Sequence, residues 1–174
     1  MKDIKEYIRT IPDYPKKGVL FRDITTVLDD ADGLRLAIDE MTKLLDGVDF
    51  DIIAGAEARG FICGMPIAYN LHKAFVPVRK KGKLPGETVS ESYDLEYGSA
   101  EIEIHKDAIK PGQKIVLVDD LIATGGTIEA AAKLCEKLGG EVVKIIFLIE
   151  LTDLGGRERL KKYDVASVTQ FEGE

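Results

Sequence analysis

The sequence predicts an α/β protein in which helices cover both faces of a central parallel β-sheet. Segments with the pattern of strands alternate along the chain with segments of helical periodicity, in the order typical of βαβ units. The strand candidates DIIAGA, KIVLVD and VVKIIFLIEL are nearly continuous apolar runs, as parallel strands buried on both faces usually are. A chain of 174 residues is long enough for one such domain with its own core.

The N-terminal segment is expected to begin with a short amphipathic helix. Its helical spacing is seen at Ile4, Ile8 and Ile11, and Pro12 ends it. The stretch PDYPKKGVLFRDIT contains two prolines and a glycine, which favours an irregular loop. A second helix follows, with apolar positions at Leu34, Ile38, Met41 and Leu45.

The rest of the chain continues the alternation, apart from one hairpin. The remaining elements are expected to be a helix from about Phe61 to Leu71, the strand AFVPV, a helix from Thr127 to Leu138, a short helix in DLGGRERLKKY and the strand VASVTQF. From Glu87 to His105, polar and apolar residues alternate, most clearly in SAEIEIH. This alternation predicts a β-hairpin with one solvent-exposed face.

Composition and charge exclude several classes of protein. The net charge of −7 argues against a general nucleic-acid binder, which needs a basic face to neutralise phosphates. The longest uncharged run, Gly60 to Leu71, is shorter than the roughly 20 residues of a membrane helix, and the charged N-terminus does not resemble a signal peptide. Cys63 and Cys135 form no ligand or redox spacing, so a cytoplasmic location is expected.

Polar turns follow two of the predicted strands. Asp119 and Asp120 come at the end of KIVLVD, and the segment from Glu57 to Gly60 follows DIIAGA. In open α/β sheets, ligands bind at the carboxyl ends of the strands. Both turns are therefore expected at one edge of the sheet, around a common ligand.

The turn ATGGT, residues 123 to 127, has the features of a phosphate site. It offers consecutive backbone N–H groups at a helix N-terminus, together with the hydroxyls of Thr124 and Thr127. The alternative is a plain strand-to-helix connection with Thr127 as the N-cap. Familiar nucleotide motifs are missing, because GAEARG has Phe61 where a P-loop needs lysine and no G-x-G-x-x-G follows a strand.

The two aspartates beside this turn point to a sugar phosphate. Ionised carboxylates only accept hydrogen bonds, which suits the hydroxyls of a cis-diol. Because successive residues of a strand point to opposite faces, both side chains can reach one ribose only if the strand ends at Asp119. The alternative is that Asp119 and Asp120 are ordinary solvated acids of a turn.

The strand, acids and turn together resemble the phosphoribosyl pyrophosphate signature of type I phosphoribosyltransferases. The blocks DYPKKGVLFRDIT, EARGF, RKKGKLPG, SYDLEYG and VDDLIATGGT occur in the order and approximate spacing of the members that act on adenine. The resemblance implies the type I phosphoribosyltransferase fold across residues 1–174. It further implies a small N-terminal hood that binds the base (residues 1–30) and a mobile catalytic β-hairpin loop (residues 79–105).

The resemblance also implies the reaction and the role of each residue. Adenine and phosphoribosyl pyrophosphate would give AMP and pyrophosphate, in purine salvage. Ala123, Thr124, Gly125, Gly126 and Thr127 would bind the 5-phosphate, and Asp119 and Asp120 the ribose hydroxyls. The pyrophosphate loop would consist of Glu57, Ala58 and Arg59, with a cis peptide between Glu57 and Ala58. The same pyrophosphate group would be clamped by Arg79, Lys80 and Lys83.

The adenine base would be bound by a separate set of residues. Phe21 would stack on the purine, and the backbones of Leu20 and Arg22 would contact its amino edge. Glu96 would take its proton, and Tyr97 would bind beside it.

Each of these roles has a plainer alternative. The basic run RKKGK (residues 79–83) would be a solvated loop, Phe21 a core aromatic, and Glu96 an exposed hairpin acid. Mg²⁺ is expected on substrate oxygens rather than in a cage of protein ligands. A homodimer is implied, with the apolar helix GFICGMPIAYNL as the candidate interface.

Three competing functions remain. One is the same chemistry on another base, such as xanthine. A second is a ligand-sensing regulator on this fold, which would need a DNA-binding segment that the stretch before Pro12 is too short to provide. A third is an interaction protein with a decayed site, which the intact Arg59, Asp119, Asp120 and Glu96 argue against.

Overall fold

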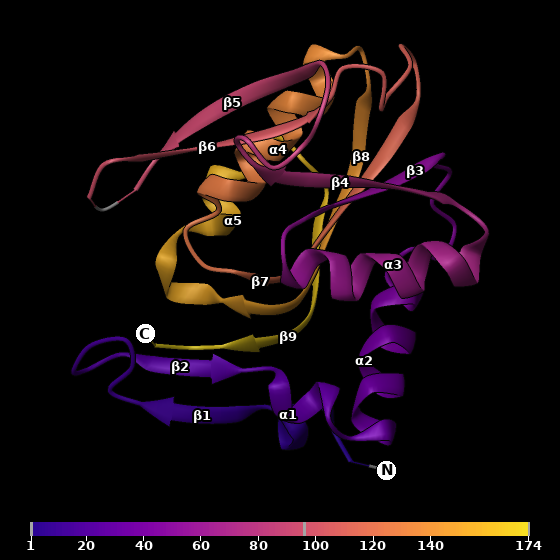
Figure 1. The fold of residues 1–174 in the computed structure, drawn as a ribbon. Helices are drawn as coiled ribbons and strands as arrows, with labels where there is room; N and C mark the ends of the chain where they lie inside the picture. Colours follow the sequence, from indigo (N-terminus) through magenta and orange to yellow (C-terminus); the bar gives the residue numbers. More distant parts are fainter. Residues whose placement is uncertain (1, 96, 174) are drawn as a thin grey trace.

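The computed structural model describes residues 2–95 and 97–173, and these contain a seven-stranded sheet in the order β5-β6-β4-β3-β7-β8-β9 (Figure 1). The parallel strands are β3 (Ile52–Ala56), β4 (Ala74–Lys80), β7 (Lys114–Ile122), β8 (Glu141–Leu151) and β9 (Val165–Phe171). An antiparallel hairpin of β5 (Thr88–Asp94) and β6 (Ser99–His105) adds to the edge beside β4. The predicted α/β fold class is confirmed.

Helices bury both faces of this sheet. Helices α2 (Ala31–Lys43) and α3 (Arg59–Leu71) pack with one hydrophobic cluster, and α4 (Gly126–Lys137) packs with the other. Alternate residues of β7 serve the two clusters, since Val116 and Val118 lie in the first and Ile115 and Leu117 in the second. This two-sided burial explains why the central strands are continuous apolar runs.

The predicted N-terminal helix is wrong beyond its first turn. Residues Ile4–Tyr7 form a 3₁₀ turn, and the chain then enters β1 (Arg9–Pro12), which pairs antiparallel with β2 (Leu20–Asp23) in a separate two-stranded sheet. Ile11 lies opposite Phe21 in this pair. The helix prediction failed because β1 takes its extended conformation from pairing with β2, which lies beyond an intervening loop. Local periodicity carries no information about such a partner.

Other boundaries differ by a few residues. Helix α1 (Thr25–Leu28) precedes α2, and Leu45 is buried just beyond the end of α2. The predicted strand AFVPV continues through Arg79 and Lys80, because both pair with β6. The predicted C-terminal helix is reduced to a 3₁₀ turn (Thr152–Leu154) and α5 (Gly156–Arg159). Within the described ranges, no helix is both long enough and apolar enough to cross a bilayer.

Candidate active site

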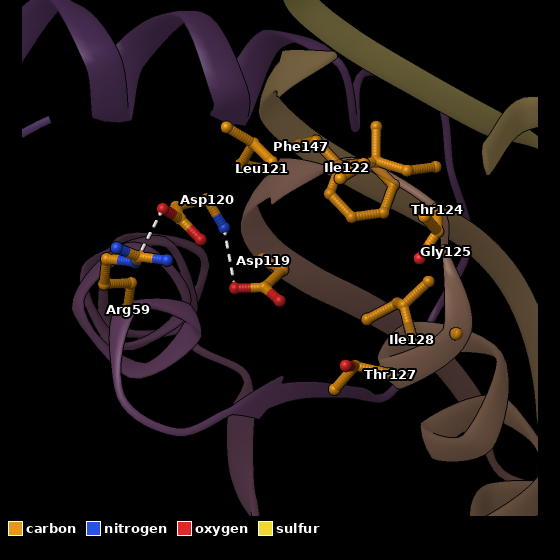
Figure 2. Close-up of a pocket in the computed structure, with 12 residues that line it drawn as sticks. Arg59, Asp119, Asp120, Leu121, Ile122, Thr124, Gly125, Thr127, Ile128 and Phe147 are labelled. Carbon is orange, nitrogen blue, oxygen red and sulfur yellow. Dashed lines mark hydrogen bonds and ion pairs between the residues drawn. The ribbon is translucent and has the colours of Figure 1, made fainter. Parts of the chain in front are cut away.

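The two polar turns identified in the sequence lie side by side. Strands β3 and β7 pair in parallel with Gly55 opposite Val118, so the residues that follow each strand meet at the same edge. A cavity of about 200 Å³ opens there (Figure 2). It is lined by Arg59, Asp119, Asp120, Leu121, Ile122, Ala123, Thr124, Gly125, Gly126, Thr127, Ile128 and Phe147. The expected convergence of the acids, Arg59 and the ATGGT turn is therefore present.

The glycine turn leads directly into α4. Gly125 is the N-cap and has a φ of +84°, a backbone conformation that glycine adopts without strain. No side chain caps this helix, so Thr127 is not the N-cap that the plainer alternative required. The N–H groups of the first turn of an α-helix have no intrahelical partner, and together with the helix dipole they favour an anion. The geometry suits a terminal phosphate.

The two aspartates differ in direction and environment. Strand β7 does not end at Asp119 but runs on to Ile122, yet both aspartates line the same cavity, so the expectation that they could share a ligand only at the end of the strand is wrong. Figure 2 shows Asp120 pointing toward Arg59, with Asp119 below it on the side of Thr127. The Asp120 Oδ2 atom lies 2.9 Å from Arg59 Nε, and the Asp120 backbone N–H donates to Asp119 Oδ1 at 2.8 Å. The Asp120 carboxylate is therefore paired with an arginine, whereas the Asp119 carboxylate accepts a backbone N–H.

The side chains that line the cavity include two acidic groups, Asp119 and Asp120, and one basic group, Arg59. Burial raises the pKa of Asp119 well above its usual range, the charge of Asp120 raises it further, and Arg59 only partly opposes this. Within residues 2–95 and 97–173, no group of three or more His, Cys, Asp and Glu side chains is arranged to hold a metal ion. Two carboxylates beside a phosphate cradle fit a hydrated Mg²⁺ that is held mainly by substrate oxygens.

Glycines allow the first turn of α3 to approach the sheet closely. A Cβ atom on Gly60 would lie 3.0 Å from the Val118 carbonyl oxygen and 3.3 Å from Asp119 Oδ1. A Cβ on Gly55 would lie 2.7 Å from the Gly60 carbonyl oxygen. This approach brings Arg59, the first residue of α3, to Asp120. The peptide bond between Glu57 and Ala58, just before the helix, is cis as the resemblance implied.

Glu57 connects this turn to the basic run. Its Oε1 atom accepts the Lys80 backbone N–H at 2.7 Å and lies 3.5 Å from Arg79 Nε. The Lys80 hydrogen bond, with a smaller contribution from Arg79, lowers the pKa of Glu57. Arg79 also donates through Nη1 to the Lys83 carbonyl oxygen at 3.3 Å. Arg79 and Lys80 thus contact Glu57 of the pyrophosphate-loop candidate and Lys83 contacts Arg79, although none of these three basic residues lines the cavity.

The predicted base-binding residues lie apart from the cavity. Leu20, Phe21 and Arg22 belong to β2, and the Phe21 ring packs edge-to-face on Tyr14 with 5.2 Å between centroids. The Arg22 guanidinium lies over the Phe171 ring of β9, with 4.3 Å between Cζ and the ring centroid, and this contact joins the β1–β2 pair to the sheet. Figure 1 shows the β5–β6 hairpin above and the β1–β2 pair below the ends of β7 and β8. Tyr97 is exposed near the hairpin tip, and Glu96 lies outside the described residues.

Sequence reasoning missed three residues around the cradle. Phe147 of β8 lines the cavity wall, opposite Asp119 in the strand register. A Cβ atom on Gly126 would lie 2.8 Å from Arg159 Nη1 and 3.7 Å from Tyr93 Cδ2. Tyr93 lies in the block SYDLEYG and could have been suspected, whereas nothing in the local sequence of α5 connects Arg159 with the turn.

Comparison with known proteins identifies the family. A family model described as the phosphoribosyl transferase domain matches residues 26–173. The chain belongs to this phosphoribosyltransferase family. The match includes every residue that lines the cavity, the basic run and the hairpin, while strands β1 and β2 precede it.

Individual phosphoribosyltransferases are similar over the full length. The adenine phosphoribosyltransferase of Agathobacter rectalis is 70% identical over 174 residues, which is 100% of each chain. The crystal structure of the enzyme of this name from Thermoanaerobacter pseudethanolicus is 58% identical, with a TM-score of 0.94 over 97% of this chain and 98% of that one. The Saccharomyces cerevisiae enzyme, solved with an imino-altritol bisphosphate and adenine, is 38% identical, with a TM-score of 0.90 over 95% and 96%.

Proposed function

We propose that this phosphoribosyltransferase transfers the 5-phosphoribosyl group from phosphoribosyl pyrophosphate to adenine, giving AMP and pyrophosphate in purine salvage. The observation that carries the proposal is the meeting of a phosphate cradle, two carboxylates and Arg59 in one cavity. A phosphate alone would be repelled by the two acids, whereas a ribose phosphate supplies hydroxyl donors for them. The full-length identity of 70% to an adenine phosphoribosyltransferase supports adenine as the base.

Within this proposal the cavity divides into three subsites. The 5-phosphate lies on the ATGGT turn, which supplies the N–H groups of the α4 N-terminus and the Thr124 and Thr127 hydroxyls. The ribose hydroxyls contact Asp119 and Asp120. The pyrophosphate lies toward Arg59 and the Glu57–Ala58 turn, with Arg79, Lys80 and Lys83 as clamps from the adjoining loop.

The chemistry at the ribose is a substitution at the anomeric carbon. The bond from this carbon to the pyrophosphate oxygen breaks, pyrophosphate leaves with the electron pair, and a bond forms to the imidazole-edge nitrogen of adenine. Positive charge develops on the ribose ring, and one carboxylate about 4 Å away would attract it by ~4 kcal/mol at an effective dielectric of 20, offset by repulsion between the carboxylate and the leaving pyrophosphate. This developing charge also favours the ionised form of Asp119, which burial disfavours in the unliganded site.

The proton of adenine is assigned to Glu96, and the base is held between the hood and the hairpin. Phe21 stacks on the purine ring, the backbones of Leu20 and Arg22 contact the amino edge, and Tyr97 binds beside Glu96. Mg²⁺ carried by the substrate neutralises phosphate charge when bound. Residues 1–30 act as the hood and residues 79–105 as the flexible loop of one domain spanning residues 1–174.

We also propose a homodimer and a cytoplasmic location. Helix α3 leaves Met65 and Tyr69 of its apolar stretch 52% and 86% exposed, and a second copy would cover them. Light scattering should give a dimer that Met65→Glu converts to a monomer, and a wild-type monomer would contradict the proposal. The cytoplasmic location rests on the two free thiols, Cys63 and Cys135, which form no disulfide.

The activity is tested with a panel of bases. Adenine, hypoxanthine, guanine and xanthine would each be incubated with phosphoribosyl pyrophosphate and Mg²⁺, and pyrophosphate release would be followed. Adenine is expected to be used at least about a hundredfold faster than the others, since a site built to bond one substrate edge rejects analogues lacking it. Faster turnover of another base would reassign the substrate, and no release with any base would refute the function.

A further inference from the structure

Glu103 is a buried acid on the hairpin face that was expected to be exposed to solvent. It lies in β6 and is only 3% exposed, whereas Glu101 on the same strand reaches Lys81 at the surface, with 2.9 Å between Nζ and Oε1. The segment between β4 and β5, residues 81–87, covers Glu103. This segment is called the basic turn below.

The carboxylate of Glu103 closes the basic turn at both ends. Its Oε1 atom accepts the backbone N–H of Gly82 at 3.1 Å and that of Leu84 at 3.0 Å. Its Oε2 atom accepts the hydroxyl of Thr88, the first residue of β5, at 3.2 Å. Both oxygens of one buried side chain are therefore bonded to the two ends of a single turn.

The basic turn is connected to the pyrophosphate loop on its other side. It carries Lys83, whose carbonyl oxygen accepts Arg79 Nη1 at 3.3 Å, and Arg79 lies 3.5 Å from Glu57. A continuous set of contacts thus runs from Glu103 through the basic turn to the residue before the cis peptide. The side chain of Lys81 takes no part in these contacts, because its ammonium pairs with Glu101.

Burial makes this arrangement sensitive to the shape of the turn. A buried carboxylate is costly unless donors surround it, and a buried acceptor that loses its donors carries the full desolvation penalty. Two of the three donors to Glu103 are backbone groups of the basic turn, and the third is Thr88, the residue that follows the turn. The conformation that holds Lys83 beside Arg79 is consequently the one in which Glu103 is satisfied.

We propose that Glu103 is a positioning residue for the leaving group, acting through the basic turn to hold Lys83 where it binds pyrophosphate. The inference rests on the clamp role of Lys83 proposed above. Glu103 itself does not contact substrate, so its effect should be confined to ligands that carry a pyrophosphate. AMP, which lacks that group, serves as the internal comparison.

The test compares Glu103→Met, Glu103→Gln and, as a matched surface control, Glu101→Gln. Glu103→Met keeps the volume but accepts no hydrogen bond, and should raise the KM for phosphoribosyl pyrophosphate and the Kd for pyrophosphate about tenfold or more. The Kd for AMP should change less than about twofold in the same variant. Glu103→Gln should restore wild-type values within about threefold, because its amide oxygen accepts both N–H groups and its NH₂ donates to the Thr88 hydroxyl.

A double-mutant cycle with Lys83→Met separates this inference from the clamp role. If Glu103 acts through Lys83, the losses in pyrophosphate affinity should be strongly non-additive. Additive losses, or equal losses for AMP and pyrophosphate, would overturn the positioning role. A Lys83→Met variant with unchanged pyrophosphate affinity would instead refute the clamp. If Glu103→Met fails to fold, Thr88→Val removes one of the three bonds and should give a smaller loss with the same ligand preference.

Discussion

Arg59 can serve two negative charges at once. Its guanidinium pairs with Asp120 through Nε, while the side chain remains 53% exposed. Because arginine carries donors on three nitrogens, this pairing leaves both Nη groups for a second anion. Arg59 can therefore bind pyrophosphate without releasing Asp120, and the ion pair fixes the direction in which the remaining donors point.

Replacing Arg59 should separate the two ligands. Arg59→Met is expected to raise the KM for phosphoribosyl pyrophosphate about tenfold or more, the size of one lost hydrogen bond to a charged group. The Kd for AMP should change much less, since AMP has no pyrophosphate. Steady-state kinetics and calorimetry measure these two quantities, and Arg59→Lys is the control that keeps the charge. Equal losses for both ligands would show that Arg59 serves the fold through Asp120.

Glu96 should act mainly in the transition state. If it accepts the adenine proton as attack proceeds, Glu96→Leu should lower kcat by ~10²–10⁴ and change KM little. Glu96→Gln keeps the shape but cannot take the proton, so it should be nearly as slow as Leu. A fully active Gln variant would make Glu96 a positioning residue, and a rise in the KM for adenine alone would make it a ground-state contact.

The element that organises the site is the junction of β7 with α4. The sequence predicted the strand, the glycine turn and the helix, because their apolar periodicities and Gly-Gly punctuation are local signals. It could not predict that β7 continues through Asp120 to Ile122, since pairing with β8 sustains those residues. Strands β1 and β2 and the burial of Glu103 could not be predicted for the same reason, because each depends on a partner distant in sequence.

The glycine turn provides a prediction for this junction. Gly126→Val should weaken binding of both AMP and phosphoribosyl pyrophosphate about tenfold or more, because a side chain obstructs backbone donation to the 5-phosphate. The fold should survive, since the added Cβ would meet Arg159 Nη1, the end of a flexible side chain, at 2.8 Å. Calorimetry with AMP measures the effect.

Arg159→Gln is the matched control, because the side chain introduced by Gly126→Val would displace this arginine. If Arg159→Gln weakens AMP binding as much as Gly126→Val does, the loss belongs to the displaced guanidinium and not to the cradle. Unchanged AMP affinity in Gly126→Val would remove the cradle from the proposed site.

The whole molecule bears a stability cost for its charged cavity. The folded-state pKa of Asp119 lies above its ordinary value of 3.8, so the folded protein binds this proton more tightly than the unfolded chain. The stability linked to Asp119 is therefore present below that value and is lost as pH rises through the raised pKa. At neutral pH, which lies above the ordinary value, the burial of Asp119 therefore costs the unliganded protein stability.

Asp119→Asn should accordingly stabilise the protein while abolishing most activity. Since each kcal/mol shifts the Tm of chains this long by about 2–4 °C, we expect a rise of at least about that size at pH 7.5 and little change near pH 4. The amide oxygen still accepts the Asp120 N–H. Asp120→Asn, which weakens the pair with Arg59, should not raise the Tm. A lower Tm for Asp119→Asn at neutral pH would contradict this account.

The order of strands in the sheet also has a consequence for how the protein is made. Strand β3 lies between β4 and β7, yet β7 spans residues 114–122 and emerges from the ribosome long after β3 and β4. Until then, one edge of β3 exposes unpaired backbone groups next to apolar side chains, a surface prone to mispairing. The centre of the sheet therefore cannot assemble until about two thirds of the chain has been synthesised.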